Sequence, residues 1–492
     1  MGTQDGAAGF GLDDPCVDDE RAALECTYAG TMRWLESLDE RNARPRDRTL
    51  LRDEPLPEKG VGAPQAVGDL WELAETRASA SSGPRSFHFV VGGTTPAALA
   101  GDWVAATLDQ VASSASGSPL AVDAERIATR WVAELVGLGR AADGSTDRWT
   151  GVMTSGATAA NIVGLGAARQ WWGEQHGVDI AQDGAFGLPP IRVFASGRVH
   201  ASVEKALAVL GLGRGSIERM SDANDGKLGV QMFKDACESL DGAPAIVVAT
   251  SGCADAGGFD PLGVMADVCD EHGLWLHVDG AFGLFAGALL DHAEKVAGVE
   301  RARSVATDAH KWLNVPYDSG IAFLSDRAFA AKTFRQRAAY LPKASPDAPR
   351  RLIPANLVLE SSRRARSFSL LAALRAWGAS GYREHFDRCF RLAERLANTV
   401  REEPLLELVA RPESVVVPFR CAPEGVRRRD LDALNVEVSR RVETVGRVAV
   451  GTTRLGGKVC FRPAIVGWRT RERHVDELVA EVLDALAFVG AM

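Results

Sequence analysis

Leu274-Trp275-Leu276-His277-Val278-Asp279 is a mostly apolar run that ends in a carboxylate. Such a short apolar run is typical of a strand buried on both faces of a sheet, and the aspartate then stands at its carboxyl end. Similar runs occur at residues 192–194, 245–249 and 320–324. Helix-like segments alternate with these runs, at residues 103–111, 123–136, 159–172, 202–210 and 260–271. The alternation predicts βαβ units and an α/β fold with a mainly parallel sheet.

The two ends of the chain differ from this central part. Residues 1–65 are polar, with one amphipathic stretch at 25–41 that predicts a helix lying on another surface. A helical tract at 369–400, interrupted at 378–381, precedes strand-like runs at 414–419, 447–450 and 458–461 and an amphipathic helix at 471–489. We therefore expect an N-terminal helical arm (1–85) that packs on a partner subunit, a large domain (86–375) and a small C-terminal α+β domain (376–492).

The composition limits the classes of function. The chain has 492 residues, of which 46% are hydrophobic and 25% charged, as in ordinary globular enzymes. Its net charge of -9 argues against a general nucleic-acid binder. The eight cysteines lack the CxxC spacing of zinc sites, and no apolar run is typical of a signal peptide or a membrane span. We expect a cytoplasmic protein without a metal site or membrane contact.

A lysine follows the opening carboxylate further along the chain, in His310-Lys311-Trp312. A carboxylate at a strand end and an amine on a later loop can hold the two ends of a pyridoxal 5'-phosphate ring. The carboxylate keeps the ring nitrogen protonated, and the amine forms an imine with the aldehyde. Either residue alone is more often a surface charge or a turn residue. The pair indicates a cofactor site only in combination with the segments around it.

Three further segments place polar groups beside predicted strands. Thr154-Ser155-Gly156-Ala157-Thr158 follows an apolar run and opens a helix, which makes a cradle for a phosphate; an ordinary helix N-cap is the alternative. His200 precedes another helix and is either a capping or surface residue or the stacking partner of a cofactor ring. A glycine-rich segment at 257–262 follows the strand near Thr250, where α/β proteins place ligand-contacting backbone.

These segments together resemble a known family. The residues that carry the resemblance are Thr154-Ser155-Gly156, His200-Ala201-Ser202-Val203, Gly258-Phe259-Asp260-Pro261-Leu262, His277-Val278-Asp279 and Asp308-Ala309-His310-Lys311-Trp312-Leu313. The chain resembles, over residues 65–480, the pyridoxal-phosphate-dependent group II amino-acid decarboxylases, which include aromatic-L-amino-acid, glutamate and cysteine-sulfinate decarboxylases. The resemblance implies the fold type I of aspartate aminotransferase, with a seven-stranded-type sheet, and a homodimer with active sites at the subunit interface.

The resemblance also implies roles for individual residues. Lys311 matches the lysine of the internal aldimine, and Asp279 matches the partner of the pyridine nitrogen. His200 matches the histidine that stacks on the ring, and Ala281 matches the small residue beneath it. The residues that match positions binding the cofactor or supporting its phosphate are Ser155, Gly156, Ala157, Thr250, Ser304, Asp308 and His310.

Substrate contacts are predicted from two parts of the chain. Phe87, His88 and Phe89 match a pocket wall that the family partly takes from the partner subunit, although phenylalanine in a half-buried strand is otherwise plain core. Arg462 falls where the family has an arginine near the substrate carboxylate, and an exposed or interface arginine is the alternative. An aromatic substrate is slightly favoured.

Tyr340 lies in a segment, up to residue 353, that is rich in Pro, Ala, Ser and Arg and is typical of an active-site loop. It matches the tyrosine that protonates Cα of the quinonoid in family decarboxylases, where aldehyde synthases carry phenylalanine; packing of the loop is the alternative role. We therefore expect decarboxylation of an L-amino acid to its amine and carbon dioxide. Oxidative deamination to an aldehyde, transamination, carbon-carbon lysis and an inactive scaffold protein are the alternatives.

Overall fold

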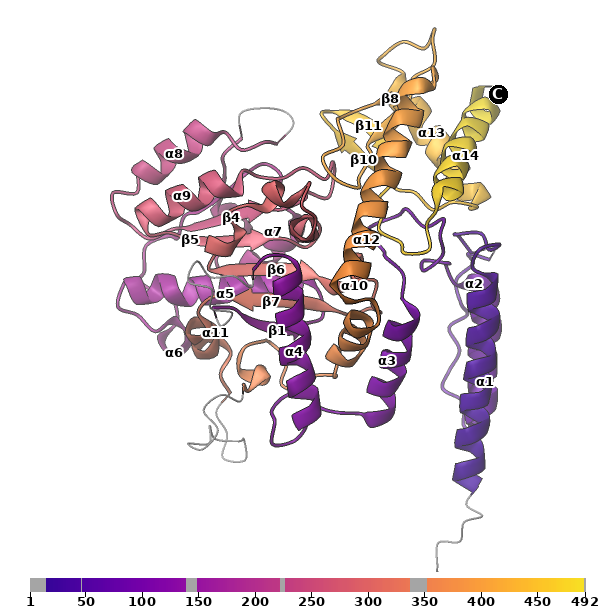
Figure 1. Cartoon of the computed structure of the whole chain (residues 1–492), viewed down its shortest axis with the longest axis horizontal. Helices are drawn as coiled ribbons and strands as arrows, with labels where there is room; N and C mark the ends of the chain where they lie inside the picture. The colour runs from indigo at the N-terminus through magenta and orange to yellow at the C-terminus, as the bar shows by residue number, and fades with distance from the viewer. Residues whose placement is uncertain (1–14, 46, 139–147, 222–225, 337–351, 491–492) are drawn as a thin grey trace, which may run out of the picture.

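The computed structural model describes residues 15–45, 47–138, 148–221, 226–336 and 352–490, and its centre is a seven-stranded sheet (Figure 1). The strands, in spatial order, are β1 (Thr150–Thr154), β7 (Gly320–Leu324), β6 (Ser304–Asp308), β5 (Trp275–Asp279), β4 (Ile246–Thr250), β2 (Val193–Ala195) and β3 (Ile217–Arg219). Strand β7 is antiparallel to both of its neighbours, and the other pairs between β6 and β3 are parallel. The predicted α/β fold with a mainly parallel sheet is confirmed.

Helices cover both faces of this sheet, which explains why its central strands are apolar throughout. One face packs against α5 (Ala157–Gln175), α7 (Ala201–Val209) and α11 (Arg327–Phe334). The other face packs against α4 (Pro119–Leu135), α8 (Val230–Glu238) and α9 (Leu262–His272). Successive residues of a strand point to opposite faces, so Val247 and Val248 of β4 belong to different hydrophobic clusters. Every residue of β4, β5, β6 and β7 is buried.

The C-terminal part contains a second, smaller sheet. Helix α12 (Ser367–Glu402) leads into it and is kinked at Gly378, whose φ of 61° and ψ of -177° are not helical. The antiparallel strands, in spatial order, are β10 (Thr452–Leu455), β11 (Lys458–Phe461), β9 (Phe419–Cys421) and β8 (Leu406–Leu408). Helices α13 (Leu431–Val445) and α14 (Glu472–Gly490) lie beside them (Figure 1). The predicted boundary at 375/376 therefore falls inside α12, close to the kink.

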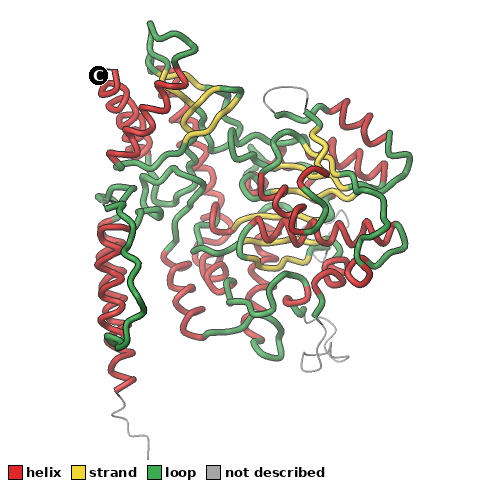
Figure 2. The backbone as a smooth tube through the Cα atoms, turned by 180° about the vertical axis from the view of Figure 1, so that it is seen from behind, coloured by secondary structure: helices red, strands yellow, loops and turns green. Residues whose placement is uncertain are grey.

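The N-terminal helices α1 (Pro15–Ser37) and α2 (Ala63–Arg77) pack on each other and stand at one side of the molecule (Figures 1 and 2). Gly30 permits this contact, because a Cβ there would lie 2.4 Å from the Trp71 ring. The predicted helical arm is confirmed, although its first helix begins and ends earlier than the amphipathic stretch suggested. Helix α3 (Pro96–Leu108) follows and packs against α12. Among the described helices, none has the length and apolar character needed to cross a bilayer.

Two predicted strands in the C-terminal part are wrong in detail. At 414–419 the ladder begins only at Phe419; before it, Val416 forms one isolated bridge with Ala464, and Pro418 has no N–H to donate. Residues 447–450 form one isolated bridge in place of the predicted strand, between Ala449 and Ser86. Both segments are held by single bridges to chain that is remote in sequence, which a local pattern cannot reveal.

A buried ion pair joins the α4 side of the large sheet to the segment before α12. Arg363 Nη2 lies 2.8 Å from Glu125 Oε1, and the two side chains are 1% and 4% exposed. The same guanidinium donates to the carbonyl oxygens of Ala112 (2.7 Å) and Met153 (2.6 Å). Glu125 Oε1 also accepts the N–H of Met153 at 2.8 Å. Removal of the arginine would leave the Glu125 carboxylate charged and buried without its partner.

We predict that Arg363→Ala lowers the free energy of unfolding by about 3–5 kcal/mol, because an unpaired buried charge is costly. The measurement is urea unfolding of the purified protein. Arg364→Ala is the matched control, since its side chain is 40% exposed in its ion pair with Asp102. It should cost no more than about 1 kcal/mol. Equal losses in the two variants would contradict the importance of the buried pair.

Candidate cofactor and active site

The predicted site segments meet at one edge of the large sheet. Strands β1, β2, β4, β5 and β6 run in the same direction, so their carboxyl ends share this edge. The segments that follow these ends are the turn 155–157, His200, Thr250, Asp279 and residues 308–311. Figure 2 shows the strands in yellow with this edge running into loops and helix starts. Open α/β sheets bind their ligands at such an edge.

Lys311 lies in α10 (Ala309–Trp312), a single helical turn directly after β6. Its Nζ is 2.8 Å from Asp308 Oδ2, and its side chain is 23% exposed. The other oxygen, Asp308 Oδ1, accepts the N–H of Ala157 at 2.5 Å. Gly92 passes next to the lysine, since a Cβ there would lie 2.0 Å from the Lys311 carbonyl oxygen. Asp308 thus connects the Lys311 amine with the first turn of α5.

His310 is held in one orientation beside this pair. Its Nδ1 accepts the N–H of Ser319 at 3.2 Å, and its Nε2 lies 3.4 Å from Asp308 Oδ1. Burial lowers the pKa of His310, against the opposing effect of the Asp308 charge. The ring stacks on Tyr317, with 4.1 Å between centroids. The neutral imidazole therefore carries its proton on Nε2, toward Asp308.

Asp279 is a buried carboxylate with several fixed hydrogen-bond donors. Its side chain ends β5, and the residue is 4% exposed. Asp279 Oδ1 accepts the N–H of Ala281 at 3.1 Å. Asp279 Oδ2 lies 3.1 Å from Asn161 Nδ2, which donates to it, and 3.5 Å from Ser202 Oγ. The charge is thus stabilised by α5, α7 and its own turn.

A chain of hydrogen bonds extends from Asp279 into the core. Asn161 Oδ1 is 2.9 Å from His277 Nε2, and His277 Nδ1 is 2.8 Å from Ser304 Oγ, which accepts the indole N–H of Trp275 at 2.9 Å. Burial lowers the pKa of His277 to about 3, so the imidazole is neutral. Each group in this chain donates a hydrogen bond to the next group on the Asp279 side. Asn161 sets this direction, because its amide N–H group faces the carboxylate. Asn161 therefore contacts Asp279 directly, and His277 supports it through Asn161.

These two supporting residues received no role from the sequence. Asn161 stands in an apolar helix and His277 in an apolar strand, and both are completely buried. A polar side chain inside an apolar element is the signal that could have found them, because buried polar groups require partners. Ser304 was predicted to bind the cofactor or to support its phosphate. It lies at the start of β6, and its hydroxyl forms hydrogen bonds with His277 and Trp275.

His200 is exposed and is the N-cap of α7, as the alternative interpretation of the sequence had it. Its Nδ1 accepts the N–H of Ser202 at 3.1 Å and is 2.8 Å from Ser202 Oγ. Since Ser202 Oγ also approaches Asp279 Oδ2, the cap brings the imidazole into the surroundings of the carboxylate. Capping thus fixes one ring nitrogen and leaves the ring free to contact a ligand.

The residues predicted to contact substrate lie in different environments. Phe87 is 1% exposed and belongs to the main hydrophobic cluster. Phe89 is 69% exposed, has a φ of 56°, and stacks on His88 with 4.0 Å between ring centroids. His88 Nδ1 in turn is 2.6 Å from Arg44 Nη2. Arg462 donates to the carbonyl oxygens of Ala254 and, at 3.0 Å, of Phe89. Tyr340 lies outside the described residues.

The edge fits a pyridoxal 5'-phosphate molecule. The hydroxyls of Thr250, Ser251 and Ser319 are buried there without a hydrogen-bond partner in the described structure. Helix α5 starts at this edge with Gly156 as an N-cap that has no capping side chain; Asp308 accepts the Ala157 N–H, and the other amides of the first turn can bind a phosphate. Side-chain space is limited at this turn, because a Cβ on Gly320 would lie 2.5 Å from the Gly156 backbone. A buried carboxylate and an amine complete the set of groups.

Comparisons with known proteins identify the family of the chain. Residues 45–422 match the model of the pyridoxal-dependent decarboxylase conserved domain. The chain is 31% identical to human cysteine sulfinic acid decarboxylase over 351 residues, covering 70% of this chain and 68% of the relative. It is 24% identical to aromatic-L-amino-acid decarboxylase of Bacillus atrophaeus over 445 residues, covering 89% and 88%.

Solved structures show the same fold. The structure of Oryza sativa TDC with PLP and tryptamine has a TM-score of 0.87, at 24% identity, covering 98% of this chain and all of that chain. Mouse CSAD in its apo form has a TM-score of 0.83, also at 24% identity, covering 96% and 99%. The fold type I of pyridoxal-phosphate enzymes predicted from the sequence is thereby confirmed. The chain belongs to the pyridoxal-dependent decarboxylase family and is a pyridoxal 5'-phosphate-dependent amino-acid decarboxylase.

Proposed function

We propose that this enzyme releases the α-carboxyl group of an aromatic L-amino acid as carbon dioxide and yields the corresponding amine, with Lys311 as its cofactor-binding amine. The observation that carries the proposal is the convergence of Lys311, Asp308 and Asp279 at one edge of the large sheet. An aromatic side chain is favoured because the Phe89 ring, stacked on His88, is exposed three residues before Gly92, which passes next to the Lys311 carbonyl oxygen. Rings stack favourably on such a surface.

Each residue at the edge has a physical task in this proposal. Lys311 Nζ holds the cofactor covalently between turnovers, and the first amides of α5, near Ser155, Gly156 and Ala157, bind its phosphate. Asp279 keeps a proton on the ring nitrogen, which the Asn161 amide assists by fixing the carboxylate. The bound cofactor supplies an electron sink for the bond that breaks.

The remaining residues orient substrate and cofactor. His200 stacks on one face of the ring and Ala281 leaves room on the other. Arg462 donates hydrogen bonds to the carbonyl oxygens of Ala254 and Phe89. Its remaining guanidinium N–H groups bind the substrate carboxylate. Thr250, His310 and Asp308 support the cofactor from the ends of β4 and β6.

Tyr340 is proposed to donate the proton that Cα receives after carbon dioxide leaves. We predict that Tyr340→Phe lowers amine formation by about 10²–10⁴-fold, the range that a positioned proton donor contributes, and shifts the product toward an aldehyde, with dissolved dioxygen as the oxidant and ammonia released. The measurement is chromatography of amine and aldehyde against released carbon dioxide. Tyr28→Phe, on α1, is the matched control and should keep the wild-type product. Unchanged amine production by Tyr340→Phe would remove its proposed role.

A screen of amino acids for carbon dioxide release tests the substrate class. The set should include the aromatic amino acids, cysteine sulfinate, glutamate and 2,4-diaminobutyrate, because relatives named for aromatic, sulfinate and diaminobutyrate substrates match this chain at 24%, 31% and 28% identity. We expect the highest kcat/KM with an aromatic substrate. A higher value with an acidic or basic amino acid would contradict the proposed substrate and leave the decarboxylase activity intact.

We also propose a homodimer in which the N-terminal arm packs on the partner. Supporting it, α1 and α2 stand to one side of the body (Figure 2). They also expose apolar side chains. The most exposed of these include Leu24 (58%), Tyr28 (60%) and Leu70 (66%). Apolar surface of this kind marks contact with another protein. Light scattering should give twice the chain mass of 52.4 kDa; the mass of a single chain at micromolar concentration would refute the dimer.

A further inference from the structure

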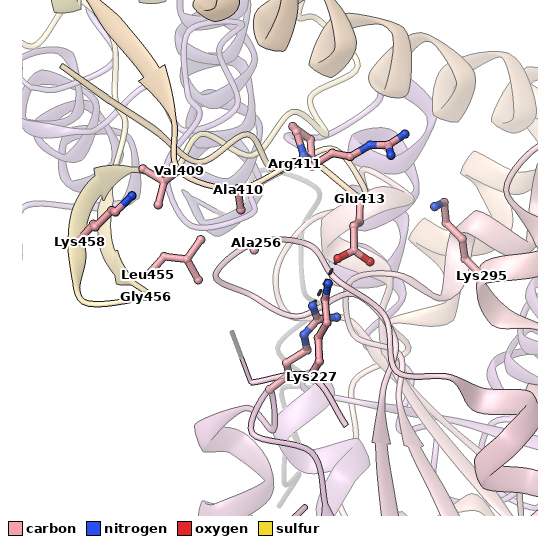
Figure 3. Close-up of a pocket in the computed structure, with 12 residues that line it drawn as sticks. Lys227, Ala256, Lys295, Val409, Ala410, Arg411, Glu413, Leu455, Gly456 and Lys458 are labelled. Atoms are coloured by element: carbon pink, nitrogen blue, oxygen red, sulfur yellow. Dashed lines mark hydrogen bonds and ion pairs between the residues drawn. The ribbon is translucent and has the colours of Figure 1, made fainter. Parts of the chain in front are cut away.

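A cavity of about 680 Å³ lies between the large sheet's loops and the small C-terminal sheet (Figure 3). From the large part it is lined by Arg198, Ala256 and Lys295, and from the C-terminal part by Arg411, Glu413 and Lys458. The volume is in the range of small-molecule sites. The cavity lies apart from Lys311 and Asp279, neither of which lines it. A ligand in it would contact both parts of the chain.

The lining of the cavity is strongly basic. Besides Arg198, the cations Lys295, Arg411 and Lys458 surround it, and Figure 3 shows these three coming from different directions. In the described part of the chain, none of these three has a carboxylate within 4.0 Å. Glu413 is the one carboxylate of the lining, and it lies 3.3 Å from Arg198. The surplus of positive charge is what a bound anion would neutralise.

Arg198 gives the cavity a rigid element. Its side chain is 6% exposed, and its Nη1 donates to the carbonyl oxygen of Phe259 at 3.0 Å. Its Nε is buried without a hydrogen-bond partner in the described structure. Lys295 lies over the Phe259 ring, 5.6 Å from the centroid, and so is held beside the same loop. Arg198 and Lys295 are therefore held in place before a ligand binds. This reduces the side-chain entropy that is lost on binding.

We propose that this cavity binds a small polyanion, a molecule that carries two or more phosphate or carboxylate groups. A single anionic group could reach the cations of only one side, whereas Arg198 and Lys295 face Arg411 and Lys458 from different parts of the fold. A polyanion bridges both sides and competes with Glu413 for Arg198. Charge-assisted hydrogen bonds to phosphate or carboxylate suit both arginine and lysine.

The cavity is joined to the active-site edge by a short loop. Ala256, which lines the cavity, is the tip of a turn closed by the Cys253 N–H donating to the Gly258 carbonyl oxygen at 2.7 Å. The Ala254 carbonyl oxygen of the same turn accepts a hydrogen bond from Arg462. A ligand that fixes this turn therefore changes the placement of Arg462. This step rests on the proposed role of Arg462 in binding the substrate carboxylate.

The first test is calorimetric titration of the holoenzyme with inorganic pyrophosphate and, separately, with citrate. We expect one site per chain and a Kd that the double variant Arg411→Ala/Lys458→Ala weakens about tenfold or more. Glu413→Gln should tighten binding, because it removes the negative charge of the lining. Lys234→Ala, which removes an exposed lysine on α8 that does not line the cavity, is the control for loss of positive charge elsewhere and should leave the Kd unchanged.

The outcomes of this titration separate the possibilities. Binding of pyrophosphate alone identifies a phosphate ligand, and binding of citrate alone identifies a carboxylate ligand; either supports the site. No binding at millimolar concentration, or equal weakening by Lys234→Ala, overturns it. The visible absorbance of the cofactor is followed in parallel, since its loss would place the anion in the cofactor's phosphate site and would also overturn the proposal.

The second test measures KM for the amino acid with and without the bound polyanion. We expect at least a twofold change in the wild type and none in Arg411→Ala/Lys458→Ala. An unchanged KM despite binding would overturn the connection with Arg462. A wild-type KM for Arg462→Lys would instead refute the proposed role of Arg462, so failure of the proposed function is distinguishable from failure of the binding site.

Discussion

Lys311→Ala is expected to lower kcat/KM for carbon dioxide release by a factor on the order of 10⁴ or more, the scale of losing a covalent catalytic group. The alanine cannot hold the cofactor covalently, and Asp308 loses the ammonium that lies 2.8 Å away. Asp308 still accepts the Ala157 N–H, so the start of α5 should keep its structure. The variant should therefore fold and bind the cofactor reversibly.

The decisive measurement pairs activity with labelling. Borohydride treatment of the wild type should fix the cofactor on the peptide that contains Lys311, and the variant should release unmodified cofactor on denaturation. Lys205→Ala is the matched control, because Lys205 is an exposed lysine on α7. It should retain both activity and labelling. Labelling of any other lysine in the wild type would overturn the assignment of Lys311.

Asp279→Asn is expected to reduce kcat by roughly 10³-fold, within the range for loss of a positioned proton partner. Asparagine has nearly the same shape, and its one amide oxygen can still accept from either Ala281 or Asn161, which bind different oxygens of Asp279, but it carries no negative charge to keep the ring nitrogen protonated. The fold should consequently be retained while the electron sink is weakened. Cofactor affinity should also fall, because the charge attraction is lost.

Three readouts check this expectation: kcat, the Kd of the cofactor, and the unfolding temperature. Asp326→Asn is a suitable control, because Asp326 is the N-cap of α11 and is distant in sequence from Asp279. Its side chain accepts the backbone N–H of Ala328. A small loss of kcat in Asp279→Asn, comparable with that of the control, would show that ring protonation does not depend on this carboxylate.

Much of the large sheet could be predicted from local pattern. The runs at 192–194, 245–249, 274–278 and 320–324 correspond to β2, β4, β5 and β7 within one residue, because each is apolar and buried on both faces. Strands β3 and β6 were not predicted. The three residues of β3 end in an exposed arginine at the sheet's edge, and Ser304, Thr307 and Asp308 interrupt the apolar pattern of β6. The antiparallel direction of β7 depends on its pairing with β1, which no local signal contains.

The site was predictable to the extent that its residues follow strand ends. Lys311, Asp308, Asp279 and Thr250 are such residues, and the structure brings them to one edge. Asn161 was not found, because its contact with Asp279 joins an α5 side chain to a strand more than a hundred residues away. Phe87 and Phe89 look alike in sequence, yet only the structure separates the buried ring from the exposed one.

The hydrogen-bonded chain behind Asp279 has one further property. Its far end is the indole N–H of Trp275, which can only donate, so the order of donors and acceptors cannot be reversed. Its one ionisable link, His277, has a pKa of about 3 and so keeps the same protonation state from mildly acidic to alkaline solution. The electrostatic potential that this chain imposes on Asp279 is therefore insensitive to pH, and an acid-induced change in activity must originate elsewhere in the protein or in the substrate.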